Sequence, residues 1–207
     1  MYAELQVTTN YSFLRSGSHP GELALQAVDL GHTAIGIADR NTLAGVVGAY
    51  TALKEYYEEH PTPPEQQTKL LVGSRIETRD GYSLLAYPTD LDAYKRLSRL
   101  LTVGNRRAAK GQCDLTFDDL SAHADGILAI VLPPRRPDDP AFHERLRGLA
   151  HLFEDRCYLA GTALFRGDDT RRLAQLDNLA DEMGVGLVAT NDVHYHAPQR
   201  RALQDVV

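Results

Sequence analysis

The sequence predicts an α/β protein in which short strands alternate with helices around a parallel sheet or a barrel. Apolar runs of strand length recur from one end of the chain to the other, and helical patterns lie between them. This alternation is typical of βαβ units. With 207 residues, of which 43% are apolar, the chain can bury one sizeable core, so we expect a single domain over residues 1–207.

The apolar patterns place each expected element. Strands are expected at Ala3 to Thr8, Ala34 to Ala38, Lys69 to Ile76, Tyr82 to Tyr87, Ile127 to Leu132, Cys157 to Phe165 and Gly186 to Thr190. The first helix is expected to begin near Pro20 with the hydroxyl of Ser18 as its cap and to end at Gly31. Further helices are expected at Leu43 to Glu59, Leu91 to Leu101, Ala141 to Leu152 and Thr170 to Met183. A barrel carries its chemistry on the loops after its strands, so the residues there are the candidates.

Asp192, His194 and His196 follow the last expected strand and form the first candidate site. Residues two apart on an extended segment share a face, so these three side chains could converge on a metal ion. A polar loop with solvated histidines is the alternative. Asp39 ends another expected strand on the same rim, although it could equally cap a helix that starts near Thr42.

Arg15, Arg40 and Arg75 fall just after three different expected strands. A guanidinium cannot ligate a metal ion, but it makes fixed contacts with carboxylates or phosphate. These arginines could therefore place positive charge beside Asp39 and Asp192, where cations might otherwise bind. Three ordinary surface arginines are the alternative reading.

Composition argues against several other functions. A formal net charge of −6 gives no sign of a DNA-binding surface. A basic cluster could still touch DNA or a partner, and it consists of Arg99, Arg106, Arg107 and Lys110. A solvated loop is the favoured alternative, because no aromatic residues interleave with this cluster for base stacking. Cys113 and Cys157 form no CxxC pair, and no GxSxG motif supports nucleophilic catalysis. No stretch approaches the roughly 18 apolar residues of a membrane span. We expect a soluble cytoplasmic protein with no membrane partner.

Four segments of the chain carry a family resemblance. They are YAELQVTTNYSFLRSGSHPGEL, GIADRNTLAGVVGAY, LTVGNRRAAKGQCDLTFDDL and VATNDVHYHAPQRRALQDVV. In this order they resemble the PHP (polymerase and histidinol phosphatase) domain of bacterial DNA polymerase III alpha subunits, and the last segment is especially similar to the error-prone paralogue of the mutasome. The resemblance covers essentially the whole chain.

The resemblance implies a distorted (β/α)7 barrel of the PHP type whose rim, in active members, binds a cluster of divalent metal ions. Most of the ligand positions carry other residues here: Gln6, Thr8, Arg15, Arg40, Arg75, Gly81, Pro133 and Phe165. Only Asp192 and His194 remain, with Asp39 and His196 nearby. A catalytic zinc needs about three protein ligands, and arginine repels cations. We therefore predict no catalytic residue, metal site or cofactor in this chain.

For function, the resemblance implies an amino-terminal fragment of a longer polymerase chain. The parent would be a DNA-directed DNA polymerase, a nucleotidyltransferase of DNA-damage tolerance and repair that acts on DNA with magnesium in its core. This domain would be an inactive scaffold for that core in cis, with mutasome proteins as further partners. The alternatives are a free-standing PHP protein, or an active metal-dependent phosphoesterase, 3'-5' exonuclease or pyrophosphatase that uses zinc or manganese.

Overall fold

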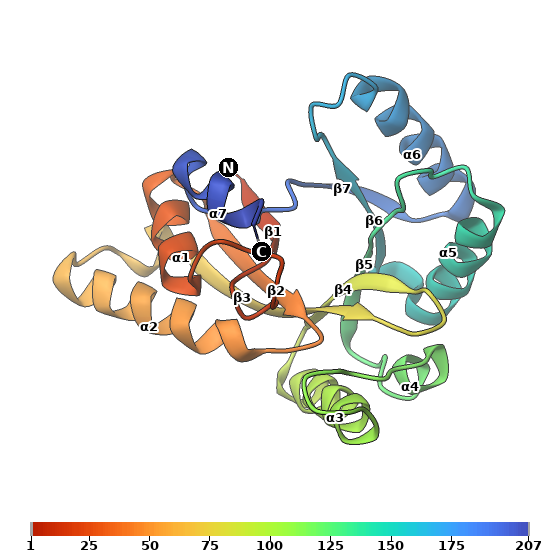
Figure 1. Cartoon of the computed structure of the whole chain (residues 1–207), viewed down its shortest axis with the longest axis horizontal. Coiled ribbons are helices and arrows are strands. Elements are labelled where there is room, and N and C mark those ends of the chain that lie inside the picture. Colours follow the sequence, from red (N-terminus) through yellow and green to blue (C-terminus); the bar gives the residue numbers. More distant parts are fainter. Residues whose placement is uncertain (1, 207) are drawn as a thin grey trace. The chain divides into compact units, whose positions relative to one another are not determined.

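The chain forms two compact units, which are described separately. The computed structural model describes residues 2–206. The first unit contains the chain up to Ser74 and again from Asn191 onward, and the second contains Arg75–Thr190. In both units helices lie beside strands (Figure 1). The expectation of a single domain over residues 1–207 remains a prediction.

The first unit contains three neighbouring strands and two main helices. The strands are β1 (Ala3–Val7), β2 (Ala34–Arg40) and β3 (Lys69–Glu77), of which β3 continues beyond this unit. β1 and β2 run parallel. The helices α1 (Pro20–Asp29) and α2 (Ala44–Glu59) pack on each other and on β2. Three short helical segments complete the unit: η1 (Pro64–Gln66), η3 (Pro198–Arg200) and α7 (Arg201–Gln204).

The core of the first unit follows from the spacing of its apolar residues. Leu23 and Ala27 lie four apart on α1, and Ala49 and Leu53 lie four apart on α2, so each pair faces one side of its helix. The core cluster consists of Val7, Leu23, Ala24, Ala27, Ile35, Ile37, Ala49 and Leu53. This packing fixes the carboxyl end of β2 against α2.

The second unit contains four strands and the helices between them. Its elements in order are β4 (Ser83–Pro88), α3 (Leu91–Arg107), α4 (Phe117–Ser121), β5 (Ile127–Val131), α5 (Pro140–Phe153), η2 (Glu154–Arg156), β6 (Cys157–Thr162), α6 (Asp169–Met183) and β7 (Gly186–Thr190). The strands are neighbours in this order. β4 pairs with β5 in the antiparallel direction, whereas β5, β6 and β7 run parallel.

Local signals explain where the helices of the second unit begin and end. The carboxylate of Asp90 accepts a hydrogen bond from the backbone N–H of Ala93 and caps α3. Thr116 and Asp119 exchange hydrogen bonds in a capping box at the start of α4. Gly184 ends α6 in the left-handed conformation, with φ of 67°.

The α/β class and the order of the strands are as the sequence predicts, but five details differ. The sheet is mixed because β4 and β5 are antiparallel. The helix expected at Leu91 to Leu101 continues to Arg107, and α4 was not expected. The side chain of Ser18 does not cap α1, because the first turn is closed instead by Glu22, which accepts from the N–H of His19. The strand expected to reach Phe165 ends at Thr162. Among residues 2–206, no helix is long and apolar enough to span a membrane.

Candidate functional site

Asp39 lies near the end of β2 and is completely buried. Its Oδ1 accepts from the backbone N–H of Thr9 at 2.8 Å and from the hydroxyl of Ser12 at 2.6 Å, and its Oδ2 accepts from the hydroxyl of Thr9 at 2.8 Å. Burial raises the pKa of Asp39, while these hydrogen bonds act in the opposite direction. The carboxylate therefore ties the loop after β1 to the end of β2. It does not cap α2, whose N-cap is Leu43 without a side-chain bond.

The first turn of α2 closes over this carboxylate. A Cβ atom placed on Gly45 would lie 2.3 Å from the Asp39 Oδ2 and 2.8 Å from the Thr9 hydroxyl. On its backbone side, Asp39 offers its carbonyl to the hydroxyl of Ser74 at 3.0 Å. Because only a glycine leaves enough room here, the site around Asp39 is closely packed rather than open.

Asp192 and His194 come together in the first unit, and Gln6 joins them. The amide Nε2 of Gln6 donates to the Oδ1 of Asp192 at 2.6 Å, and the Nε2 of His194 lies 3.4 Å from the same oxygen. The Nδ1 of His194 lies 2.8 Å from the backbone carbonyl of Arg15. Gln6 stands at one of the positions where the family resemblance implies that a metal ligand has been replaced. Its amide contacts the Asp192 carboxylate, which a metal ion would otherwise approach.

His196 does not join this pair, which corrects the expectation that three side chains share one face. Its Nδ1 lies 2.8 Å from the Ser18 hydroxyl and 3.7 Å from the Oε2 of Glu22. The same Ser18 hydroxyl accepts from the backbone N–H of His196 at 3.0 Å. The chain bends at His196, so the extended conformation that the alternation requires does not continue past this residue.

The described residues do not fit a metal cluster of the kind that the sequence resemblance implies. Within residues 2–206, no group of three or more His, Cys, Asp or Glu side chains is placed to hold one ion. A catalytic zinc site needs about three protein ligands. Asp192 and His194 alone provide two, and Asp39 already accepts from Thr9 and Ser12.

The other replaced ligand positions lie in both units. Thr8 is buried and pairs through its backbone N–H with the carbonyl of Val193 at 2.9 Å. Arg40 is exposed at the end of β2. Phe165 lies in the second unit with 93% of its surface exposed and φ of 54°. Arg75 contacts Glu77 through its Nε at 2.9 Å, so one of the three arginines has an acidic partner that the sequence did not suggest.

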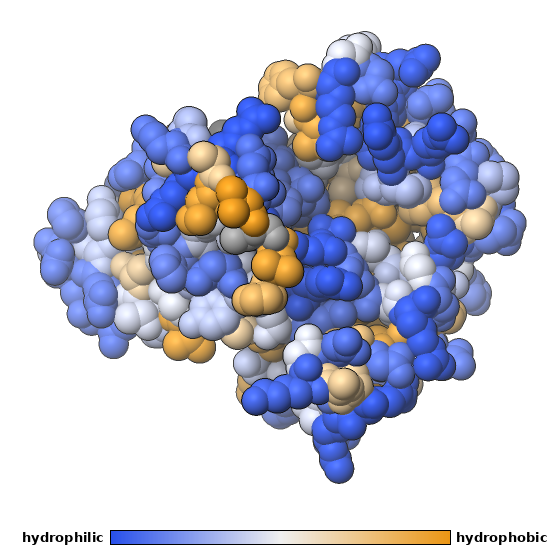
Figure 2. All heavy atoms as spheres, in the orientation of Figure 1, coloured by the Kyte–Doolittle hydropathy of each residue, from blue (hydrophilic) through white to orange (hydrophobic). Residues whose placement is uncertain are grey.

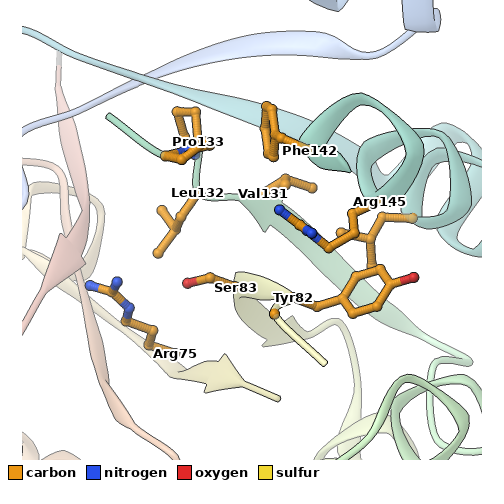
Figure 3. Close-up of a pocket in the computed structure, with 11 residues that line it drawn as sticks. Arg75, Tyr82, Ser83, Val131, Leu132, Pro133, Phe142 and Arg145 are labelled. Atoms are coloured by element: carbon orange, nitrogen blue, oxygen red, sulfur yellow. The ribbon is translucent and has the colours of Figure 1, made fainter. Parts of the chain in front are cut away.

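Three replaced positions, Arg75, Gly81 and Pro133, line one cavity in the second unit (Figure 3). The cavity has a volume of about 180 Å³. Two polar residues that the sequence did not single out, Ser83 and Arg145, also line it. No sequence signal marks them, because Ser83 opens an ordinary apolar strand and Arg145 is one of several charged residues on α5.

The basic cluster expected in a loop lies mostly on a helix. Arg99, Arg106 and Arg107 belong to α3, and only Lys110 follows it. Arg107 makes a bidentate contact with Asp119, at 2.6 Å and 2.9 Å. Cys157 is buried in β6, and this burial raises the pKa of its thiol to about 12.

Comparison with known proteins places these features in a family. Residues 4–159 match the family described as PHP domain. The chain is 49% identical over 208 residues to an "Error-prone DNA polymerase" of Caulobacter vibrioides and 48% identical over 207 residues to one of Rhodopseudomonas palustris. Each alignment covers 100% of this chain and 18% of the relative, so the chain spans less than a fifth of the length of these polymerases.

Solved structures support the same fold. A Bifidobacterium adolescentis protein assigned as a metal-dependent phosphoesterase superposes with a TM-score of 0.65 over 94% of this chain and 88% of that one, at 17% identity. An amidohydrolase from Chromobacterium violaceum gives a TM-score of 0.59 over the same shares of the two chains, at 13% identity. At these identities the likeness concerns the fold alone, and it confirms the expected α/β architecture of the PHP type.

Proposed function

Because this chain belongs to the PHP family, we propose that it is the PHP domain of an error-prone DNA polymerase and that it serves as a structural domain without hydrolytic activity of its own. One observation carries the second half of this proposal. The carboxylate of Asp192 is contacted by the amide of Gln6 at 2.6 Å, at a position where the family resemblance leads us to expect a metal-binding histidine. An amide N–H can satisfy the hydrogen-bonding capacity of a carboxylate oxygen, so this carboxylate does not need a cation.

The surroundings of Asp39 support the same proposal. Its two oxygens accept three hydrogen bonds from Thr9 and Ser12, and the first turn of α2 leaves no room beside them. A metal ion would have to displace these donors and move Gly45. The hydrogen bonds hold the loop after β1 in place, which is a structural role.

An exposed apolar loop supports a contact with the rest of the polymerase. Tyr11, Phe13 and Leu14 follow β1 and are 54%, 85% and 62% exposed. Figure 2 shows apolar side chains on the surface of this unit. Neighbouring apolar side chains that remain in water favour burial against a partner. We infer that this loop packs on the polymerase core in cis, and that the basic face of α3 at Arg99 and Arg106 is a second contact.

The proposed parent protein carries out DNA-directed DNA synthesis during DNA-damage tolerance. It would be a cytoplasmic nucleotidyltransferase that binds DNA and uses magnesium in a core outside these residues, and mutasome proteins would be further partners. The support is the 44% to 49% identity with polymerases over the whole chain.

A metal-dependent phosphoesterase is the second candidate function. The observation that favours it is the pairing of Asp192 with His194, together with the fold likeness to a protein assigned to that activity. Exonuclease and pyrophosphatase activities with zinc or manganese belong to the same candidate.

Metal content and hydrolysis distinguish the two functions. The chain is incubated with zinc and manganese, desalted and measured by elemental mass spectrometry, and it is then assayed with a phosphodiester and with pyrophosphate. We expect far less than one ion per chain and no turnover. Stoichiometric metal that is lost in Asp192→Asn, but not in the exposed control Asp181→Asn, together with turnover, would establish the phosphoesterase.

The apolar loop is tested by comparing Phe13 with Phe165, because both side chains are largely exposed. In the full-length polymerase, Phe13→Ser should lower thermal stability and polymerase activity, whereas Phe165→Ser, at 93% exposure, should leave both unchanged. Neither substitution should alter the melting temperature of the 207-residue chain. Equal effects of the two variants in the polymerase would contradict the proposed contact.

A further inference from the structure

We propose that the cavity of the second unit binds a small tetrahedral oxyanion of the phosphate type, without a metal ion. This site is separate from the carboxylates described above and does not depend on the polymerase assignment. The cavity is lined by Arg75, Gly81, Tyr82, Ser83, Val131, Leu132, Pro133, Pro134, Phe142, Arg145 and Leu149. None of these described residues is acidic, and two carry a guanidinium.

Ser83 supplies a buried hydroxyl that has no hydrogen-bond partner among the described residues. A buried polar atom without a partner costs about 1 to 3 kcal/mol, so proteins rarely keep one without a reason. Figure 3 shows this hydroxyl pointing to the side of the cavity on which Arg75 lies. A bound oxygen acceptor would satisfy it once the side chain turns toward the cavity, because this oxygen is itself almost fully covered.

Arg145 brings the first positive charge. It reaches inward from α5 (Figure 3), and its Nη1 would lie 3.7 Å from a Cβ atom placed on Gly81. Gly81 has φ of 89°, which strongly favours glycine and keeps this space free of a side chain. The nearest acid, Asp139, lies 3.9 Å away and is 45% exposed, so it neutralises this guanidinium only weakly.

Arg75 is the second arginine of the cavity, and Glu77 holds it in place and balances part of its charge. Its Nε lies 2.9 Å from the Oε1 of Glu77, and both side chains are less than one fifth exposed. This ion pair fixes the direction of the Arg75 side chain at the cavity wall. An oriented arginine loses less entropy when it binds an anion than a mobile one does.

The remaining walls strengthen these contacts. Val131, Leu132, Phe142 and Leu149 are apolar and lower the local dielectric constant, which increases the attraction between a guanidinium and an anion. On the rim, the Nη2 of Arg172 donates to the carbonyl of Pro134 at 3.2 Å and positions this loop. The volume of about 180 Å³ lies below the roughly 300 Å³ of ordinary ligand pockets, which favours a small ion.

Calorimetric titration of the 207-residue chain with inorganic phosphate tests the proposal. We expect saturable binding of one phosphate per chain. Pyrophosphate and acetate are titrated in parallel, and both should bind more weakly, because the first is larger and the second is planar. Acetate binding as tight as phosphate binding would overturn the tetrahedral assignment, and the absence of saturable phosphate binding would overturn the site.

Two arginines on the same helix provide a matched pair of variants. Arg145→Gln should weaken phosphate binding about tenfold or more, because it removes a charge-assisted hydrogen bond. Arg147→Gln should leave the affinity unchanged, because Arg147 is 57% exposed and pairs with Glu144 at 2.6 Å. If both variants weakened phosphate binding equally, phosphate would be attracted by the charge of the chain in general and not by this cavity.

Ser83→Ala distinguishes an effect on phosphate binding from an effect on folding. The substitution should preserve or raise the melting temperature of the chain by itself, but it should reduce the further rise that phosphate causes. Without phosphate, this variant should melt at the same or a higher temperature than the parent, since it removes an unpaired buried hydroxyl. With saturating phosphate, the rise in melting temperature should be smaller than in the parent. A full phosphate response in Ser83→Ala would contradict the proposed contact with the anion.

Discussion

The two units differ in what surrounds the positions at which the family resemblance implies metal ligands. In the first unit, both oxygens of Asp39 accept hydrogen bonds from Thr9 and Ser12, and the amide of Gln6 donates to Asp192. In the second unit, the hydroxyl of Ser83 and the Nη1 of Arg172 are buried without a hydrogen-bond partner among the described residues. Where the family resemblance implies metal ions, the first unit supplies hydrogen-bond donors, and the second supplies a cavity with positive charge.

This difference shows that loss of ligands has two distinct physical outcomes. A carboxylate that loses its cation must gain donors, because burying an unpaired charge is costly. Gln6, Thr9 and Ser12 provide such donors in the first unit. A cavity lined with arginine instead lacks acceptors, and an anion can supply them. Variants of the first unit that remove the Asp39 carboxylate, fill the space beside it or replace Gln6 by an acid test the first of these outcomes.

The largest effect should come from Asp39→Ala. The substitution leaves the N–H and hydroxyl of Thr9 and the hydroxyl of Ser12 without their acceptor in a fully buried place. We expect a loss of about 3 to 5 kcal/mol in the free energy of unfolding, measured by denaturant titration. The exposed control Asp118→Ala should unfold like the parent. A small loss in Asp39→Ala would mean that water replaces the carboxylate and that the site is open.

Gly45→Ala tests the close packing around the same carboxylate. The new Cβ would lie 2.3 Å from the Asp39 Oδ2, so either the carboxylate or α2 must move. We expect a loss of about 2 kcal/mol, although alanine is intrinsically the better helix former by about 1 kcal/mol. Gly148→Ala on α5 is the matched control, since its Cβ would meet no atom closer than 3.9 Å and should stabilise the chain. If both Gly45→Ala and Gly148→Ala stabilised the chain, close packing around Asp39 would be ruled out.

Gln6→Glu tests whether the amide has taken over the role of a cation. The new carboxylate would face Asp192 across the present 2.6 Å contact, and we expect a loss of about 2 kcal/mol at neutral pH from their repulsion. Manganese should then raise the melting temperature of Gln6→Glu, because three ligating side chains would surround the space. The parent and Gln6→Met should not respond to manganese. A response in the parent would point to a metal site already present.

Much of the fold could be predicted from the sequence because each element carries a local signal. Apolar spacing located every strand, and Pro20, Pro140 and Gly184 mark helix ends by their backbone preferences. The direction of β4 could not be predicted in this way. A strand that is buried on both sides has the same apolar pattern whether its neighbour runs parallel or antiparallel.

The candidate site was less predictable, because its contacts join residues that lie far apart in the chain. Asp192 and His194 could be found by their motif, and Thr9 follows an expected strand. The role of Gln6 depends on an oxygen 186 residues away, and no spacing rule reveals this contact. His196 was placed wrongly because the chain bends at this residue, and the alternation of side chains holds only for an extended segment. Ser83 and Arg145 carry no signal until the cavity is seen.

The smallest effect concerns Glu22, which ties α1 to the carboxyl-terminal segment of the first unit. Its Oε1 accepts from Arg200 at 2.7 Å, and its Oε2 accepts from the N–H of His19 at 2.8 Å. Burial raises its pKa, but the hydrogen bond from His19 and the charges of His196, Arg200 and His19 outweigh this effect, so the pKa is lowered from 4.5.

A carboxyl whose pKa is lower in the folded state stabilises the fold above its ordinary pKa, and this contribution disappears as the pH falls below it. The free energy of unfolding of the parent should therefore fall between about pH 5 and about pH 3, and Glu22→Gln should reduce this fall. Denaturant titrations at several pH values measure how steeply the free energy of unfolding falls with pH in the parent and in Glu22→Gln. Identical slopes would mean that Arg200 and His196 contact Glu22 without favouring its charged form, and the carboxyl-terminal segment would then be held by its other hydrogen bonds, such as those between His196 and Ser18.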